Sequence, residues 1–165
     1  MAAPISQTRK NFPISRLLIF KRVVQATLLL VILLIVLYFS GILALDFDIN
    51  LTAEIIGGLI VLIFLVAFFY EKAYFSSYFY DLTADYVIIK KDPIFPREIT
   101  VPYDRITSVT IDRDIFDLLL GIWDLHINTN NSALLGMEPH IEGLRREAAN
   151  GLQGVLMAQI KDQKK

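Results

Sequence analysis

The 165-residue sequence contains no cysteine. This absence excludes disulfides, thiolate nucleophiles and cysteine-ligated zinc sites, and it agrees with a reducing compartment for the soluble part of the chain. A basic stripe is missing too, because residues 71–165 carry 11 basic and 14 acidic side chains. Nucleic-acid binding needs such a stripe to neutralise phosphates, so we expect no nucleic acid among the partners.

Recognisable catalytic and cofactor motifs are also missing. The sequence holds no nucleophile elbow, no phosphate-binding loop, no dinucleotide fingerprint and no HExxH zinc motif. Its two histidines, His126 and His140, cannot complete a four-ligand structural zinc site without carboxylates. We therefore predict no catalytic residue, no cofactor and no bound metal, and we expect a protein that is not an enzyme.

Charged residues are absent from two long apolar segments. The first, Val23 to Leu45, has 23 positions without charge, or ~34 Å of helix, enough to cross a hydrocarbon core of ~30 Å. A cleavable signal peptide is the alternative, but its apolar region is usually ~7 to 15 residues and ends in small residues. We predict a transmembrane helix over residues 23–45, in agreement with a 55% share of hydrophobic residues.

The second apolar run, Ile55 to Tyr70, is shorter at 16 residues. It gains length from its apolar or small N-terminal neighbours and from Lys72, whose long side chain can reach the headgroups. We predict a second transmembrane helix over residues 53–74, with a buried or re-entrant helix as the alternative. The short loop 46–52 then joins the two helices into an antiparallel hairpin.

Basic residues indicate the orientation of this hairpin. Five of them lie in residues 1–22, none lies in loop 46–52, and more follow the second span. The positive-inside rule then places both termini in the cytoplasm, at the cell membrane. Gly57 and Gly58 favour close helix packing, either within one chain or between copies.

Beyond residue 76 the hydrophobic period changes to about two, which is typical of strands. Three strands are predicted at Ser77–Leu82, Tyr86–Lys90 and Arg97–Val101, and the prolines of the intervening KDPIFP segment make it a loop. A further weak strand is expected at Ala133–Met137.

The stretch from Val101 to Thr129 carries several local signals. A bulge at Thr107–Ser108 restores an interrupted alternation. Asp114 is suited to cap one helical turn that Gly121 closes, and a clean strand begins at Trp123.

A C-terminal helix is predicted from Ile141 to Lys161. Gly151 and Gly154 lower helix propensity, and close approach to the sheet is a reason for their presence. The helix has an apolar stripe at steps of three and four: Ile141, Leu144, Ala148, Leu152, Val155, Leu156 and Ile160.

Acidic residues in the same stretch are candidates for a metal-binding site. Asp112 and Asp114 have the spacing of a D-x-D metal motif, but the intervening arginine favours charge pairing and capping. Asp124 and His126 share one strand face, so they form either a pH-sensitive pair or, more simply, an exposed strand surface.

The segment from Tyr80 to Thr129 resembles the bacterial PH-like domain family, also called the YdbS/YdbT-like or DUF304 family, and the similarity extends over residues 77–160. It implies a PH-like split β-barrel, and members of this family often carry one or two membrane helices before the domain; with the hairpin predicted above, we expect an α+β protein. The barrel, over residues 76–161, has about seven strands and a capping C-terminal α-helix; residues 162–165 form a tail. The matching residues are Pro102, Tyr103, Arg105, Ile106, Ser108, Val109, Leu119, Leu120 and Gly121.

The loop between the second and third strands departs from the family pattern and is our candidate interaction site. It combines basic and exposed apolar side chains, which suit either a protein partner or an anionic lipid surface. We expect a cytoplasm-facing module for protein interaction or assembly, with a protein partner or further copies of the chain. The alternatives are an anionic-lipid sensor and an accessory subunit of a membrane enzyme or transporter. The candidate residues are Lys90, Lys91, Ile94, Phe95 and Arg97.

Overall fold

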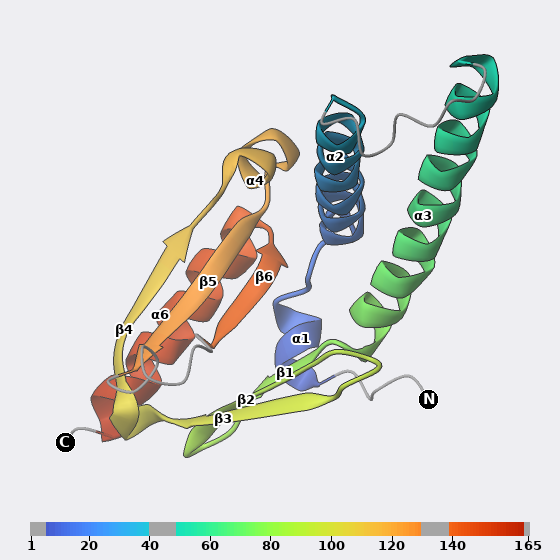
Figure 1. The fold of residues 1–165 in the computed structure, drawn as a ribbon. Helices are drawn as coiled ribbons and strands as arrows, with labels where there is room; N and C mark the ends of the chain where they lie inside the picture. Colours follow the sequence, from blue (N-terminus) through green and yellow to red (C-terminus); the bar gives the residue numbers. More distant parts are fainter. Residues whose placement is uncertain (1–5, 40–48, 130–138, 164–165) are drawn as a thin grey trace. The chain divides into compact units, whose positions relative to one another are not determined.

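The computed structural model describes residues 6–39, 49–129 and 139–163. The chain divides into two compact units, one formed by Met1–Leu18 with Tyr74–Lys165 and the other by Ile19–Ala73. Figure 1 shows the elements, which are α1 (Gln7–Asn11), α2 (Leu17–Phe39), α3 (Ile49–Ser77), β1 (Phe79–Leu82), β2 (Tyr86–Lys91), β3 (Arg97–Pro102), η1 (Tyr103–Arg105), β4 (Ile106–Asp112), α4 (Ile115–Leu120), β5 (Trp123–Thr129), β6 (His140–Leu144) and α6 (Arg146–Gln163).

The unit Ile19–Ala73 consists of the greater parts of α2 and α3. Both helices are long enough and apolar enough to cross a membrane, over Leu17–Tyr38 and Glu54–Ser77. Arg22, near the start of α2, forms an ion pair with Glu71, near the end of α3, at 3.5 Å. This pairing of opposite helix ends fits an antiparallel hairpin. The predicted boundaries of the spans and of loop 46–52 stay predictions.

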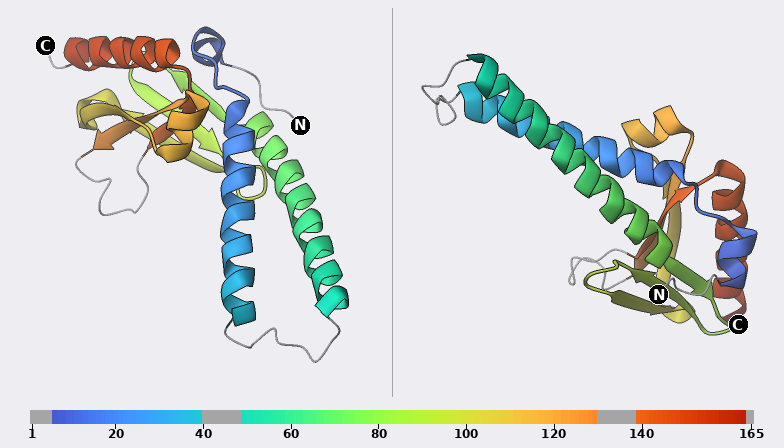
Figure 2. Two further views of the ribbon diagram at one scale, coloured as in Figure 1. Left: turned by 90° about the horizontal axis from the view of Figure 1, so that it is seen from above. Right: turned by 90° about the vertical axis from the view of Figure 1, so that its right-hand side faces the viewer.

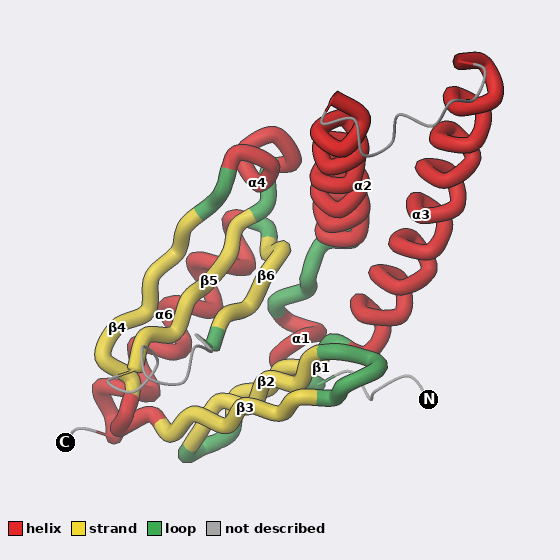
Figure 3. The backbone as a smooth tube through the Cα atoms, viewed as in Figure 1, coloured by secondary structure: helices red, strands yellow, loops and turns green. Residues whose placement is uncertain are grey.

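The other unit is a domain with two antiparallel sheets. The first has the order β1-β2-β3 and the second β4-β5-β6, and Figure 3 shows that the strands of the two sheets run in different directions. Six strands are thus present in the part of the chain that the structure describes, in two sheets, and a single closed barrel of about seven strands is not shown. The predicted strand Ala133–Met137 lies outside the described residues.

Strand β1 begins two residues later than predicted. Helix α3 continues to Ser77, and the Tyr78 N–H still donates to the Tyr74 carbonyl at 2.9 Å, as in a helix. Only Tyr78 separates α3 from β1. A strand prediction from alternation alone missed this, because helical hydrogen bonding extends into the alternating segment.

The local signals between β3 and β5 are confirmed. The β4–β5 register shifts between Ile106 and Ser108, which is the predicted bulge. The Asp114 side chain accepts from the Asp117 N–H at 2.8 Å while the Asp117 carboxylate accepts from the Asp114 N–H at 3.0 Å. This reciprocal capping box starts α4, and Gly121 ends it with a left-handed φ of 66°.

The C-terminal prediction was wrong at its start. Residues His140–Leu144 form β6, and the helix begins only at Arg146. Apolar residues three apart share one face of a helix, whereas in a strand they lie on opposite faces. Residues 141–144 are all buried, and pairing of Leu125 with Ile141 and of Trp123 with Leu144 makes the segment a strand. Helix α6 then covers the β4-β5-β6 sheet, as Figure 2 shows. It buries Ala149, Leu152, Leu156 and Ile160.

Residues 6–18, which we call the N-terminal segment, are part of the domain. Ile14 and Leu18 belong to its hydrophobic core, with exposed fractions of 7% and 1%. The ring of Phe12 lies where a Cβ on Gly151 would sit, 2.7 Å from one ring carbon. Gly151 therefore allows close approach of this segment rather than of the sheet, while Gly154 faces open space.

Candidate functional site

The turn between β2 and β3 holds the predicted interaction residues. Ile94 and Phe95 are 62% and 71% exposed. Their backbone N–H groups donate to the Asp92 carboxylate at 3.1 and 3.4 Å, and Asp92 itself has a left-handed φ of 79°. The turn is therefore shaped by its own hydrogen bonds and presents two apolar side chains to the surroundings.

The basic residues beside this turn have acidic neighbours. Lys90 forms an ion pair with Glu98 at 3.0 Å, and Lys91 forms one with Glu142 at 3.1 Å. Arg97 is exposed at the start of β3. Because two of the three cations are compensated, the turn lacks the excess positive charge of a polyanion site. The binding role of the five residues stays a prediction.

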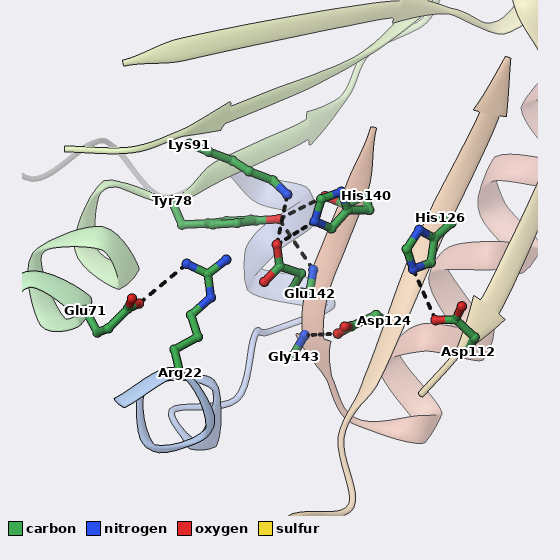
Figure 4. A network of polar contacts seen from close by, with 10 residues as sticks. All are labelled: Arg22, Glu71, Tyr78, Lys91, Asp112, Asp124, His126, His140, Glu142 and Gly143. Carbon is green, nitrogen blue, oxygen red and sulfur yellow. Dashed lines mark hydrogen bonds and ion pairs between the residues drawn. The ribbon is translucent and has the colours of Figure 1, made fainter. Parts of the chain in front are cut away.

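A polar cluster joins the two sheets, and Figure 4 shows its side chains pointing toward one another. We define it as Tyr78, Lys91, His140 and Glu142. One oxygen of Glu142 contacts both the Lys91 ammonium at 3.1 Å and His140 Nε2 at 2.6 Å. The Tyr78 hydroxyl donates to the His140 carbonyl at 3.1 Å, and Lys91 lies over the Tyr78 ring. The cluster thus links β6 to β2 and to the residue before β1.

The two histidines lie against each other. Their rings stack with centroids 5.4 Å apart and planes 16° from parallel. His126 contacts Asp112 at 3.1 Å, while the Asp124 carboxylate accepts from the Gly143 N–H at 2.8 Å. His126 thus has Asp112 of β4 as a partner, and Asp124 holds the backbone of β6.

The two aspartates of the D-x-D pattern, Asp112 and Asp114, have different structural roles. Asp112 pairs with His126 across the β4–β5 ladder, and Asp114 caps α4. Among the described residues, no group of three histidine or carboxylate side chains could hold a metal ion. The Asp112–His126 contact connects β4 to β5. Glu142, which contacts His140 within β6, also reaches Lys91 of β2 and so connects the two sheets.

The N-terminal segment covers an edge of each sheet, which sequence analysis did not find. At β1, Ser6 donates to the Tyr80 carbonyl and Arg9 to the Tyr78 carbonyl. At β6, the Ser15 N–H donates to the Gly143 carbonyl at 2.7 Å.

Burial accompanies this contact and shifts the pKa values of two of its groups. Burial lowers the pKa of the Arg9 guanidinium and raises the pKa of the Tyr80 hydroxyl from their ordinary values. The Tyr80 hydroxyl donates to the Phe12 carbonyl, so the segment satisfies a polar group that the core would otherwise leave unpaired.

Two apolar helices of membrane-spanning length and a two-sheet domain covered by a C-terminal helix make this an α+β protein. The family model described as bacterial PH domain matches residues 16–160, and the chain belongs to this family. The match includes the apolar helices as well as the domain. No curated protein matches the chain, and no solved structure matches it. PH-like domains are generally non-catalytic.

Proposed function

We propose that this chain is a non-catalytic, membrane-anchored PH domain protein whose cytoplasmic domain binds a protein partner, or another copy of the chain, through the free edge of β3. One observation carries the proposal: the N-terminal segment covers β1 and β6, whereas β3 has no such cover among the described residues. An uncovered edge strand is a template for an added strand.

The four sheet edges differ in their neighbours. The β1 and β6 edges meet the N-terminal segment, and at β4 the Gln153 amide of α6 donates to the Val109 carbonyl at 2.9 Å. In the described part of the chain, β3 pairs only with β2. Its exposed side chains include Arg97, Glu98 and Thr100. Strand β3 is thus the edge on which a partner strand meets least obstruction.

Membrane anchoring rests on α2 and α3. Both meet the length and composition of spanning helices. Most of their apolar side chains between Leu28 and Phe69 for which burial is described are at least partly exposed within the chain, so a lipid environment would remove this surface from water. The five basic residues before Val23 support a cytoplasmic position for the N-terminus and the domain.

Photo-crosslinking in intact membranes tests the β3 edge. A photoreactive residue at Thr100 should give a discrete adduct, whereas one at Ala158, also exposed but on α6, should not. The purified, reconstituted protein distinguishes the two partners, because an adduct formed there is a second copy. Absence of any Thr100 adduct in membranes and in the purified protein would refute the proposal.

The cysteine-free sequence allows a clean test of topology. Single cysteines at Asn50 and at Ser108 should react with a membrane-impermeant maleimide from opposite sides of sealed vesicles. Labelling of both from the same side would exclude the proposed arrangement, because Asn50 lies in the predicted extracytoplasmic loop and Ser108 in the domain.

A further inference from the structure

Helix α4 exposes an apolar face that the fold does not use. Ile115, Leu118 and Leu119 are 76%, 56% and 76% exposed. They stand at spacings of three and four, so they share one side of the helix. The Asp114–Asp117 capping box holds the helix in shape, and Asp117 is buried. The apolar side chains are thus presented outward by a fixed element.

Strand pairing places α4 at the end of its sheet where α2 begins. Trp123, which follows α4, pairs with Leu144. Leu144 forms a bridge with Ile14, and the neighbouring Gly143 packs against Leu18, in the first turn of α2. These contacts all lie within the domain. They fix α4 near the point where the chain leaves the domain for the first span.

The exposed turn between β2 and β3 likewise lies at the end of its sheet that is connected to a span, in this case α3. Phe79, the first residue of β1, pairs with Lys90, near the end of β2. Because only Tyr78 lies between α3 and β1, the turn carrying Ile94 and Phe95 lies at the end of the sheet that α3 enters. Each sheet therefore presents an exposed apolar tip at the end connected to a span.

The short connections determine what surrounds these tips when α2 and α3 cross a bilayer. Leu18, in the first turn of α2, is in the domain core, and Tyr78, directly after α3, is fully buried. The turn extends about 10 Å beyond β2, at ~3.3 Å for each of about three residues. This reach is comparable with the polar headgroup layer, ~5 to 8 Å deep on each side of the bilayer.

The residues around α4 also suit a lipid interface. Arg113 stacks on the Trp123 ring, with its guanidinium carbon 4.4 Å from the ring centroid, and Arg146 approaches the same ring at 5.9 Å. Tryptophan is enriched at membrane interfaces, and arginine can contact lipid phosphates while its stem lies along apolar surface.

We propose that α4 is an interfacial anchor: Ile115, Leu118 and Leu119 insert into the bilayer that α2 and α3 span, and Ile94 and Phe95 form a second contact. This inference rests on the membrane anchoring proposed above. The two tips hold the domain against the membrane and leave β3 accessible along its edge. We favour lipid over a protein partner as the occupant of α4, because α4 lies near the point where the chain leaves the domain for the first span.

Fluorescence quenching in liposomes tests the anchor with the full-length protein. Single cysteines at Leu119, Ile115 and Phe95 carry an environment-sensitive label. The matched control is Ala84, which is exposed in the β1–β2 turn, at the end of the β1-β2-β3 sheet opposite Phe95. Spin-labelled phosphatidylcholine with a shallow nitroxide should quench the first three labels several-fold more than the Ala84 label. Aqueous iodide should show the reverse order.

A label at Val61, within α3, separates failure of this inference from failure of membrane anchoring. A Val61 label that spin-labelled lipid leaves unquenched would refute the anchoring and the inference with it. If lipid quenches the Val61 label but iodide reaches the Leu119 label as readily as the Ala84 label, the inference about α4 is overturned while membrane anchoring stands. A Leu119 label shielded from both quenchers would also overturn it, because a protein surface would then cover α4.

Discussion

Replacement of Gly143 by alanine should destabilise the domain through two separate effects. Gly143 has a left-handed φ of 73°, which costs a residue with a Cβ about 1–2 kcal/mol. The added methyl group would also lie 2.9 Å from the Leu18 Cβ and 3.3 Å from Ile14 Cγ2. Overpacking of this kind costs about 1–3 kcal/mol. Together they predict a loss of about 2–5 kcal/mol in the free energy of unfolding.

Two further glycine substitutions separate these effects. Gly121 has a similar φ of 66°, yet an added Cβ there meets nothing within 4 Å. Gly121→Ala therefore measures the conformational cost alone, about 1–2 kcal/mol. Gly154 lies in α6 with open space around it, so Gly154→Ala should stabilise the helix by up to about 1 kcal/mol.

Urea unfolding of the detergent-solubilised protein provides the measurement. Trp123 is the only tryptophan and begins β5, so its fluorescence reports on the domain. Gly143→Ala should lower the free energy of unfolding by more than Gly121→Ala does. Equal losses in the two variants would refute the packing of the N-terminal segment against β6, because only the Leu18 and Ile14 contacts distinguish them.

Two further predictions concern the α4 cap and a buried tyrosine. Asp114→Ala should cost about 1 kcal/mol of stability, whereas Asp112→Ala, which removes a partly exposed ion pair, should cost less; equal costs would contradict the capping role. Burial raises the pKa of Tyr103 to about 12, so its stabilising contribution is complete below pH ~10 and is lost as the pH rises through 12. Tyr103→Phe should therefore flatten the fall in urea-unfolding free energy between pH ~10 and ~12, by up to about 1.4 kcal/mol per pH unit, and an unchanged slope would argue against this burial.

Local chemistry explains which parts of the fold could be predicted from the sequence. The bulge near Ser108 and the Asp114 cap are confirmed, because each depends on residues within a few positions of one another. The apolar helices follow from composition over a long window. The segment Ile141–Leu144 was misassigned because its apolar spacing is that of a helix face, whereas in the structure it is a strand buried on both faces that pairs with β5.

The candidate site shows the same division. The β2–β3 turn was predicted as exposed and apolar from its prolines and its Ile94–Phe95 pair, and the exposed fractions of these residues agree. The ion pair between Lys91 and Glu142, 51 positions apart, could not be predicted. The stacking of His126 on His140 depends on the register between β5 and β6 and was equally inaccessible.

The sequence by itself determined the two apolar helices, the period-two domain after them and the family to which the chain belongs, because these depend on composition, short-range order and recurring residues. Only the tertiary structure decided that residues 6–18 belong to the domain. Their contacts reach residues more than 60 positions away, such as Tyr80 and Gly143. A short segment has no periodic pattern from which its distant partner could be predicted. Only the folded structure shows which sheet edges it covers and which it leaves open.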